Sequence, residues 1–282
     1  MRNCSKLIVC GWDEVFVLDL GRDPPPKVWS WRAADAWPDS PHLAAQFATT
    51  DECKPLDDGS VVLVTSSSGA AAAVGRETGD ALFYAAVPNA HSIEWLPLGR
   101  VVVASSGSWG LNRLLLFDLN RPAEPLWSEE LAWAHGAVWD AERETLWALG
   151  STELRAYSLR EWDTHAPSLE RAATFELPDP GGHDLSPQPR TPLLNVTTGR
   201  RVWHFDRDAA SQGGASPFAP HPRLSDGPGV KCVSVDPMSG RTAWVQAEGE
   251  HWWAERIRFL DPDGELHLPG GRIYKVRWDP AG

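Results

Sequence analysis

The sequence predicts an all-β protein, a six-bladed β-propeller with four antiparallel strands in each blade. Two observations lead to this fold class. Short apolar stretches separated by turn residues repeat about every 40 to 50 residues, and helix-period patterns are weak along the whole chain. Four-stranded units of this length are typical of propeller blades. Glycine and proline number 24 each among the 282 residues, a content that suits many short strands joined by turns.

Five units follow one another from residue 51 onward, and the clearest reads AHGAVWD, ETLWALGS, ELRAYSL and RAATFEL. The ends of the chain supply the sixth unit. The N-terminus offers only three strands, KLIVCG, EVFVLDL and KVWSW, and the C-terminus offers one, RIYKVRWD, which resembles the first strand of the other units. We therefore expect one propeller domain over residues 1–282, its last blade closed by N-terminal strands plus the C-terminal strand. A pair of β-sandwiches, the competing architecture, leaves the single C-terminal strand unexplained.

The composition argues against some classes of binding partner. The formal net charge is −12 and no basic stretch offsets it, which argues against nucleic acid or an anionic membrane as the main partner. The N-terminus is no secretion signal, and about 18 continuous apolar residues occur nowhere, so no membrane span is expected. We expect a cytoplasmic protein, or a secreted one whose leader is absent from this sequence. Four cysteines show no CxxC spacing, and a disulfide stays open.

The repeat places six polar residues at one equivalent position, the start of the first strand in each blade. First strands line the central channel of a propeller, so these residues are expected at one mouth of it. They are Asp51, His91, His135, His183, Lys231 and Tyr274, spaced by 40, 44, 48, 48 and 43 residues. The acidic and basic residues Glu52, Lys54, Glu94 and Asp184 lie within three positions of this ring. Two interpretations remain open, a water-filled channel whose polar groups satisfy one another, and a functional site.

The turns between the second and third strands of each blade come to the same face. They carry the tryptophans Trp12, Trp109, Trp252 and Trp253, with Asn112 and Arg200 among the polar residues beside them. Flat rings next to amide and guanidinium groups suit sugars, whose apolar faces stack on aromatic rings and whose hydroxyls need hydrogen bonds. The alternative is that each turn tryptophan covers a neighbouring blade.

Segments such as VPNAHSIEWLPLGRVVVASS, AHGAVWDAERETLWALG and EHWWAERIRFL resemble a family of bacterial six-bladed propellers of unknown function, from Trp12 to about Asp261. This resemblance implies the fold and no reaction. More loosely, the histidine-rich mouth is similar to that of propeller polysaccharide lyases, whose histidines bind a metal or act on a uronate. The second resemblance is one of architecture, and fold alone does not fix function.

These observations predict a carbohydrate-active propeller whose ligand is a small molecule or an acidic oligosaccharide. A β-eliminating lyase needs a base, a cation facing the substrate carboxylate and an acid for the leaving oxygen. His91, His135 or His183 would be the base, Lys231 or a bound cation would face the carboxylate, and Tyr274 would be the acid. The three histidines with Asp51 would also suit one divalent metal ion. We expect substrate contacts from the residues Asp51, Glu52, Lys54, Glu94, Trp12, Trp109, Asn112, Arg200, Trp252 and Trp253.

Two alternatives stay open. A glycoside hydrolase needs two carboxylates beside the bond, and Asp51, Glu52, Glu94 and Asp184 are available. A non-catalytic glycan-binding or protein-interaction propeller needs no base at all. The inter-strand turns differ from blade to blade, which favours one asymmetric site over six equal ones.

Overall fold

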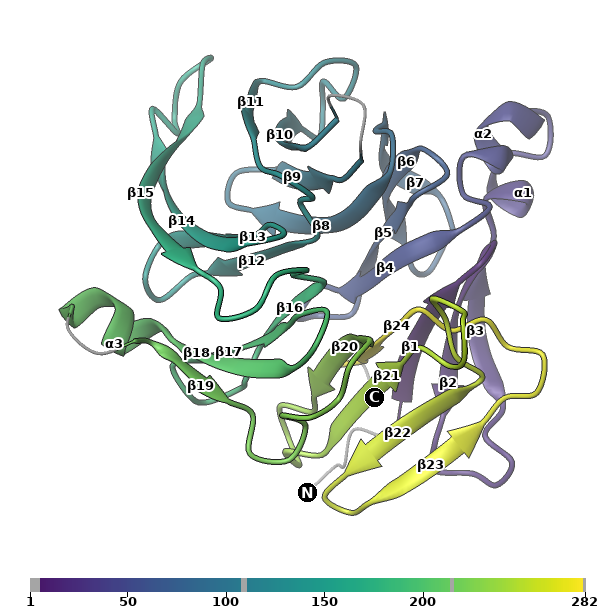
Figure 1. Ribbon diagram of the computed structural model, residues 1–282. Coiled ribbons are helices and arrows are strands. Elements are labelled where there is room, and N and C mark those ends of the chain that lie inside the picture. The colour runs from purple at the N-terminus through teal and green to yellow at the C-terminus, as the bar shows by residue number, and fades with distance from the viewer. Residues whose placement is uncertain (1–5, 108–110, 214–215, 281–282) are drawn as a thin grey trace.

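Six four-stranded antiparallel sheets surround a central axis in the computed structural model, which describes residues 6–107, 111–213 and 216–280 (Figure 1). The six-bladed propeller predicted from the repeat is confirmed. We number the blades in chain order. Each blade has its first strand next to the axis and its fourth strand at the outside.

The strands of the six blades have the following bounds. Blade 1 consists of β24 (Lys275–Trp278), β1 (Lys6–Gly11), β2 (Glu14–Asp19) and β3 (Lys27–Trp31). Blade 2 consists of β4 (Thr50–Pro55), β5 (Val61–Ser66), β6 (Ala70–Gly75) and β7 (Ala81–Ala86). Blade 3 consists of β8 (Ala90–Leu96), β9 (Arg100–Ser105), β10 (Arg113–Asp118) and β11 (Trp127–Glu130). Blade 4 consists of β12 (Gly136–Asp140), β13 (Thr145–Leu149), β14 (Glu153–Arg160) and β15 (Ser168–Glu176). Blade 5 consists of β16 (Asp184–Pro187), β17 (Leu193–Thr197), β18 (Val202–Asp206) and β19 (Phe218–Pro220). Blade 6 consists of β20 (Val230–Val235), β21 (Thr242–Gln246), β22 (Arg256–Leu260) and β23 (Gly264–His267).

Strands from both ends of the chain close the ring, as the sequence predicts. The C-terminal strand β24 pairs antiparallel with the N-terminal strand β1, with Leu7 opposite Trp278 and Cys10 opposite Lys275. Because the ring is closed, every blade packs against a blade on each side, and the exposed sheet edges of an open array are removed.

The core lies between blades. Side chains along a strand alternate between its two faces, and in β1 both faces are buried. Ile8 and Cys10 pack toward blade 2, whereas Leu7 and Val9 pack toward blade 6. Each of the other blade interfaces likewise contains a cluster of buried apolar residues, so the ring is held by six side-by-side contacts around the axis.

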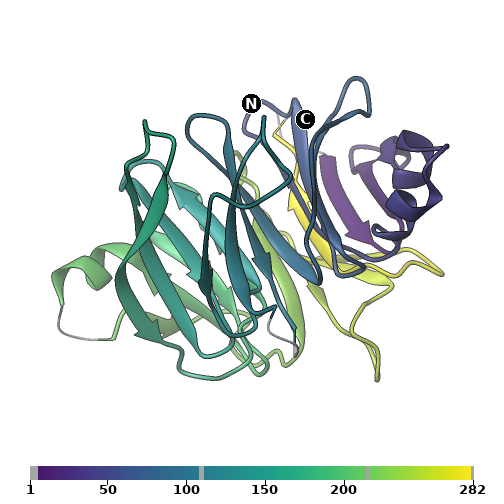
Figure 2. The same cartoon turned by 90° about the horizontal axis from the view of Figure 1, so that it is seen from above.

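Within the described part of the chain, three short helices lie at the outside of the ring. Helices α1 (Ala33–Ala36) and α2 (Pro41–Ala45) connect blade 1 to blade 2, and α3 (Arg207–Gln212) follows β18. Figures 1 and 2 place all three away from the axis. No helix within the described ranges has the length and apolarity that crossing a membrane would require.

Candidate functional site at the channel mouth

The six polar residues at the repeated position meet at one mouth of the channel. Asp51, His91, His135, His183, Lys231 and Tyr274 all line one cavity of about 240 Å³, joined by Ser67, Asn89, Ser106, Trp133 and Trp252. Each comes from the beginning of a different inner strand or the residue just before it. The chain therefore gathers residues from all six blades in a space of the size of a small ligand.

The three imidazole rings lie side by side in this cavity. The ring centre of His135 is 4.2 Å from that of His91 and 5.0 Å from that of His183. Burial lowers the pKa of His91, although the charge of Asp51 opposes that shift. Burial also lowers the pKa of His135 well below its usual range, and the two neighbouring histidines add to the effect. The cluster is therefore neutral at pH 7.

Two of the histidines have a defined tautomer. The Nδ1 atoms of His91 and His135 lie 2.9 Å from the carbonyl oxygens of Asn89 and Trp133. A carbonyl only accepts hydrogen bonds, so Nδ1 carries the proton and Nε2 is left as a free base. Adjacent blades therefore present two imidazoles in the same tautomer, each with an unprotonated Nε2.

A repeated backbone feature produces this geometry. The residue two positions before the ring residue has a positive φ in four blades, namely Asn89 (49°), Trp133 (50°), Gly181 (83°) and Gly229 (73°). Asparagine and glycine adopt this region readily, but tryptophan does so at a cost in strain. The Trp133 indole lines the cavity wall and is 50% exposed, and the backbone that carries it adopts an unfavourable conformation.

Lys231 and His183 form a direct pair. The Nζ atom of Lys231 lies 2.9 Å from Nε2 of His183, so the ammonium group donates to the imidazole. Burial, followed by the charge of Lys231, lowers the pKa of His183 to about 3. Burial and the charge of Lys275 lower the pKa of Lys231 to about 8. At pH 7 the pair therefore presents one positive charge, on Lys231, to the cavity.

Asp51 and Tyr274 lie at the other side of the histidines. The Asp51 Oδ1 atom is 3.9 Å from Nε2 of His91, and its other oxygen accepts the backbone N–H of Ser67. Burial raises the pKa of Asp51, with His91 opposing the shift. Burial also raises the pKa of the Tyr274 phenol well above its usual value, so Tyr274 keeps its proton. The protonated phenol of Tyr274 and the carboxyl group of Asp51 are thus both within reach of one ligand.

The rim of the cavity is aromatic, as the turns predict. Trp252, 39% exposed, stacks on Trp12 with ring centres 5.5 Å apart and meets Tyr274 edge-on at the same distance. Trp253 contacts Trp12 edge-on and stacks on His251. Trp109 lies outside the described residues. Trp133, which was not predicted from the sequence, also lines the cavity wall. Its position, two residues before a histidine of the ring, is the sequence feature that could have indicated it.

Glu52 does not face this cavity. Its carboxylate is fully buried below the mouth, where Arg277 donates to both of its oxygens at 3.0 Å. Arg277 also pairs with Asp184, and Lys275 Nζ lies 3.4 Å from Glu52 Oε2 and 3.2 Å from Asp184 Oδ1. We call these four residues the ionic plug, because they form a buried cluster of two cations and two anions below the mouth. Both cations come from β24, which sequence analysis treated only as a closing strand.

Lys54 and Glu94 lie at the opposite mouth. They pair at 3.2 Å and line a second cavity, of about 530 Å³, whose walls include Trp95 and Trp139. Side chains alternate along a strand, and each further residue moves about 3.3 Å along the axis. Lys54 and Glu94 lie three residues after the ring positions Asp51 and His91, which is enough to place their side chains beyond the ionic plug, at the opposite mouth.

Two other predicted contacts also lie apart from the cavity. Arg200 is exposed in the turn between β17 and β18 and is not among the lining residues. Asn112 acts indirectly, because its Oδ1 accepts the backbone N–H of Trp133 at 2.9 Å and of Gly107 at 3.1 Å. Asn112 therefore fixes the strained loop that carries Trp133.

Residues 19–280 match the family of unknown function DUF6528. The chain belongs to this family. The match covers most of the propeller, and the family expected from the resemblance is confirmed. A comparison with curated proteins found no match.

For this DUF6528 protein a divalent metal at the mouth stays a prediction. Nδ1–H bonded to a carbonyl with Nε2 free is how metal-binding histidines are commonly held. However, His183 Nε2 is engaged by Lys231, and within residues 6–107, 111–213 and 216–280 no group of three or more His, Cys, Asp or Glu side chains is arranged to hold a metal. A metal bound by all three histidines would require Lys231 to withdraw from His183. Elemental analysis of the purified protein tests this prediction.

Proposed function

We propose that this DUF6528 propeller is a carbohydrate-active enzyme that cleaves an acidic oligosaccharide by β-elimination at the histidine-lined mouth. The observation that carries the proposal is the arrangement of neutral imidazoles with free Nε2 atoms opposite a lone ammonium group in one small cavity. Elimination from a uronate needs this combination of a base and a cation.

We assign each step of the elimination to one residue that lines the mouth cavity. The uronate carboxylate pairs with the Lys231 ammonium, which stabilises the negative charge that develops when the neighbouring C–H bond breaks. Nε2 of His91 accepts that proton, and the Asp51 carboxylate, 3.9 Å away, stabilises the resulting imidazolium. The electron pair of the C–H bond becomes the new C=C bond and the C4–O4 bond breaks. Tyr274 donates its phenolic proton to the departing oxygen.

The distribution of carboxylates favours elimination over hydrolysis. Hydrolysis needs two carboxyl groups on either side of the scissile bond. Among the described residues, Asp51 is the one carboxylate that lines the mouth cavity. Glu52 and Asp184 are bound by Arg277 in the ionic plug, and Glu94 faces the opposite mouth.

The aromatic rim supports a carbohydrate ligand. The exposed parts of Trp133 and Trp252 lie at the entrance of a polar cavity, so that an apolar sugar face can contact an indole while hydroxyls reach the histidines. The cavity lies at the axis, where residues from all six blades meet, which suits one catalytic centre better than the repeated pockets of a lectin.

The free thiols support the cytoplasmic alternative for this function. Cys10, Cys53 and Cys232 are buried and form no disulfide, and Cys10 and Cys53 belong to the same buried cluster between blades 1 and 2. Neighbouring thiols persist most readily in a reducing compartment. An enzyme located there would act on short oligosaccharides rather than on polymers outside the cell.

The test is incubation with oligomers of galacturonate, glucuronate and mannuronate while ultraviolet absorbance is recorded, because elimination creates a conjugated double bond. We expect absorbance to rise, and His91→Ala to slow the rise at least about a hundredfold. His165→Ala, at an exposed loop position, is the control and should leave the rate unchanged.

Three outcomes contradict the proposal in distinguishable ways. New reducing ends without absorbance would indicate hydrolysis. Tight binding without cleavage, unaffected by His91→Ala, would indicate a glycan-binding propeller. Absence of any uronate binding would leave a protein-interaction propeller as the better interpretation.

A further inference from the structure

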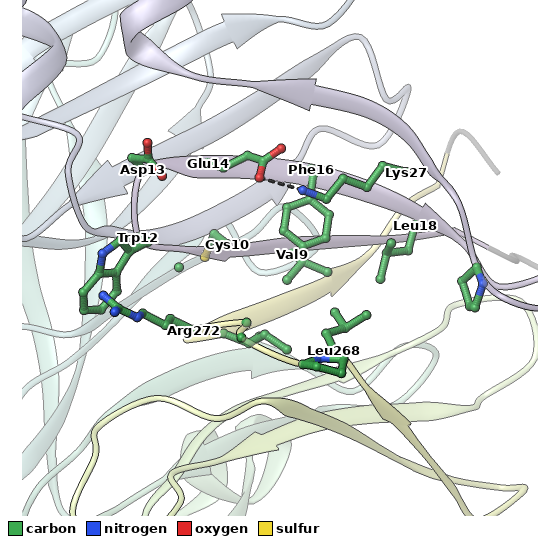
Figure 3. A pocket seen from close by; sticks show the side chains of 16 residues that line it. Val9, Cys10, Trp12, Asp13, Glu14, Phe16, Leu18, Lys27, Leu268 and Arg272 are labelled. Carbon is green, nitrogen blue, oxygen red and sulfur yellow. Dashed lines mark hydrogen bonds and ion pairs between the residues drawn. The ribbon is translucent and has the colours of Figure 1, made fainter.

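A groove of about 690 Å³ runs outward from the channel mouth between β2 and the segment 268–273 that leads into β24 (Figure 3). Figure 3 shows Val9, Phe16 and Leu18 facing Leu268 across it, with Trp12 and Arg272 at one end and Lys27 toward the other. The groove is nearly three times as large as the mouth cavity and combines an apolar floor with charged ends.

The groove and the mouth share a wall. Trp12 lines the groove and stacks on Trp252, which lines the mouth cavity. Arg272 lines the groove and Tyr274 the mouth, only two residues further along the chain. Two residues of extended chain span about 7 Å. A ligand longer than the mouth cavity would therefore pass directly from one space into the other.

Arg272 is the cation at this junction. Its exposed guanidinium lies 4.1 Å from the ring centre of Trp12, on a ring that also stacks with Trp252. No carboxylate of the described chain is within ion-pair distance of it. The other cations near the groove are paired, since Lys27 contacts Glu14 at 2.7 Å and Arg32 contacts Asp13 at 3.0 Å. Aromatic stacking thus holds Arg272 in place, and none of the residues that the structure describes accepts a hydrogen bond from its guanidinium.

The backbone around Arg272 is also fixed. A Cβ atom on Gly11 would lie 1.9 Å from the carbonyl oxygen of Arg272, so β1 and the 268–273 segment pack backbone against backbone. Where these two segments meet, the N–H of Tyr274 also donates a hydrogen bond to the carbonyl oxygen of Cys10, at 2.9 Å. The arginine is therefore presented from a rigid junction rather than from a free loop.

We propose that this groove holds the sugar units next to the one bound at the histidines, and that Arg272 binds the carboxylate of the adjacent unit. A guanidinium matches a carboxylate with two parallel hydrogen bonds, and the apolar floor suits the hydrophobic faces of a sugar chain. The proposal rests on the proposed function and makes the substrate an oligouronate with acidic units next to one another.

Calorimetry with single uronates and trimers of galacturonate, glucuronate and mannuronate tests it, with carboxyl-reduced trimers as a neutral control. For the uronate that binds, we expect the acidic trimer to bind at least about tenfold more tightly than the single unit. Arg272→Gln should remove that gain and leave the affinity of the single unit unchanged. Arg121→Gln, an exposed arginine of blade 3, is the matched control and should change neither affinity.

The outcomes separate the two proposals. Equal affinity for single units and trimers, or a trimer affinity that Arg272→Gln does not change, overturns the groove proposal and leaves the mouth site standing. Equal weakening of both lengths by Arg272→Gln also overturns it, because the arginine would then act on the mouth itself. If no uronate of either length binds, the proposed function is wrong.

Discussion

The Nζ atom of Lys231 lies 2.9 Å from Nε2 of His183, and the pair carries a single positive charge over a wide pH range. His183 has a pKa of about 3 and Lys231 a pKa of about 8, so between these values the imidazole is neutral and the amine is charged. The charge of the pair therefore changes near pH 3 and near pH 8, and both changes can be measured.

We predict that His183 destabilises the protein in acid. The unfolded chain binds a proton at this residue below about pH 6.5, whereas the folded chain does so only near pH 3. Stability should therefore fall as the pH decreases from 6.5 to 3, by up to about 1.4 kcal/mol per pH unit from this group. His183→Gln should flatten the pH dependence of urea unfolding by that amount, and His165→Gln should not. An identical slope in wild type and His183→Gln would contradict the prediction.

We predict that activity declines above about pH 8, where Lys231 loses the proton that makes it a carboxylate partner. Lys231→Arg keeps the positive charge to higher pH because arginine is always protonated in this range. The alkaline limb of kcat/KM should therefore move upward in Lys231→Arg, even if the maximum is lower. A limb that stays at the same pH would show that another group controls it.

We predict that Arg277→Met destabilises the fold by about 3 to 5 kcal/mol, because Glu52 and Asp184 then lose their shared bidentate partner while buried. Urea unfolding at pH 7 gives the free energy. Arg121→Met removes an exposed arginine and should change stability by less than about 0.5 kcal/mol. A similarly small effect of Arg277→Met would mean that the two carboxylates are solvated in solution.

We predict that Gly11→Ala costs at least about 2 kcal/mol, because the new methyl group meets the Arg272 carbonyl at a φ of 153°. The displaced segment should also alter the tryptophan fluorescence of the Trp12–Trp252 stack. Gly264→Ala is the control, since nothing lies within 4 Å of its added methyl group. Equal stability of the two variants would show that the junction is loose.

The repeat made the ring of His91, His135 and His183 predictable, because strand order in a propeller fixes which end of each inner strand faces a given mouth. It did not place Glu52, Lys54 and Glu94 correctly relative to that mouth. Their depth along the axis depends on the register of each inner strand, and β4 and β8 both shift register near their first residues. One sequence cannot show such a shift.

Arg272 and Arg277 were missed for a different reason. Both lie in or next to the C-terminal strand, where charged residues alternate with apolar ones as they do in many half-exposed strands. Their importance comes from partners distant in the chain, Glu52 and Asp184 for Arg277 and Trp12 for Arg272. The place of Trp133 at the cavity wall was not predicted, because its backbone has a positive φ, which is unusual for tryptophan.

Because both cations of the ionic plug belong to the last strand, they are also the last residues of the plug to leave the ribosome. Until Lys275 and Arg277 emerge, Asp184 lacks both of its cationic partners, and Glu52 has only Lys54, 3.9 Å away. A chain that ends before β24 therefore leaves Asp184 without a counter-charge at the axis and leaves Glu52 with one cationic partner instead of three.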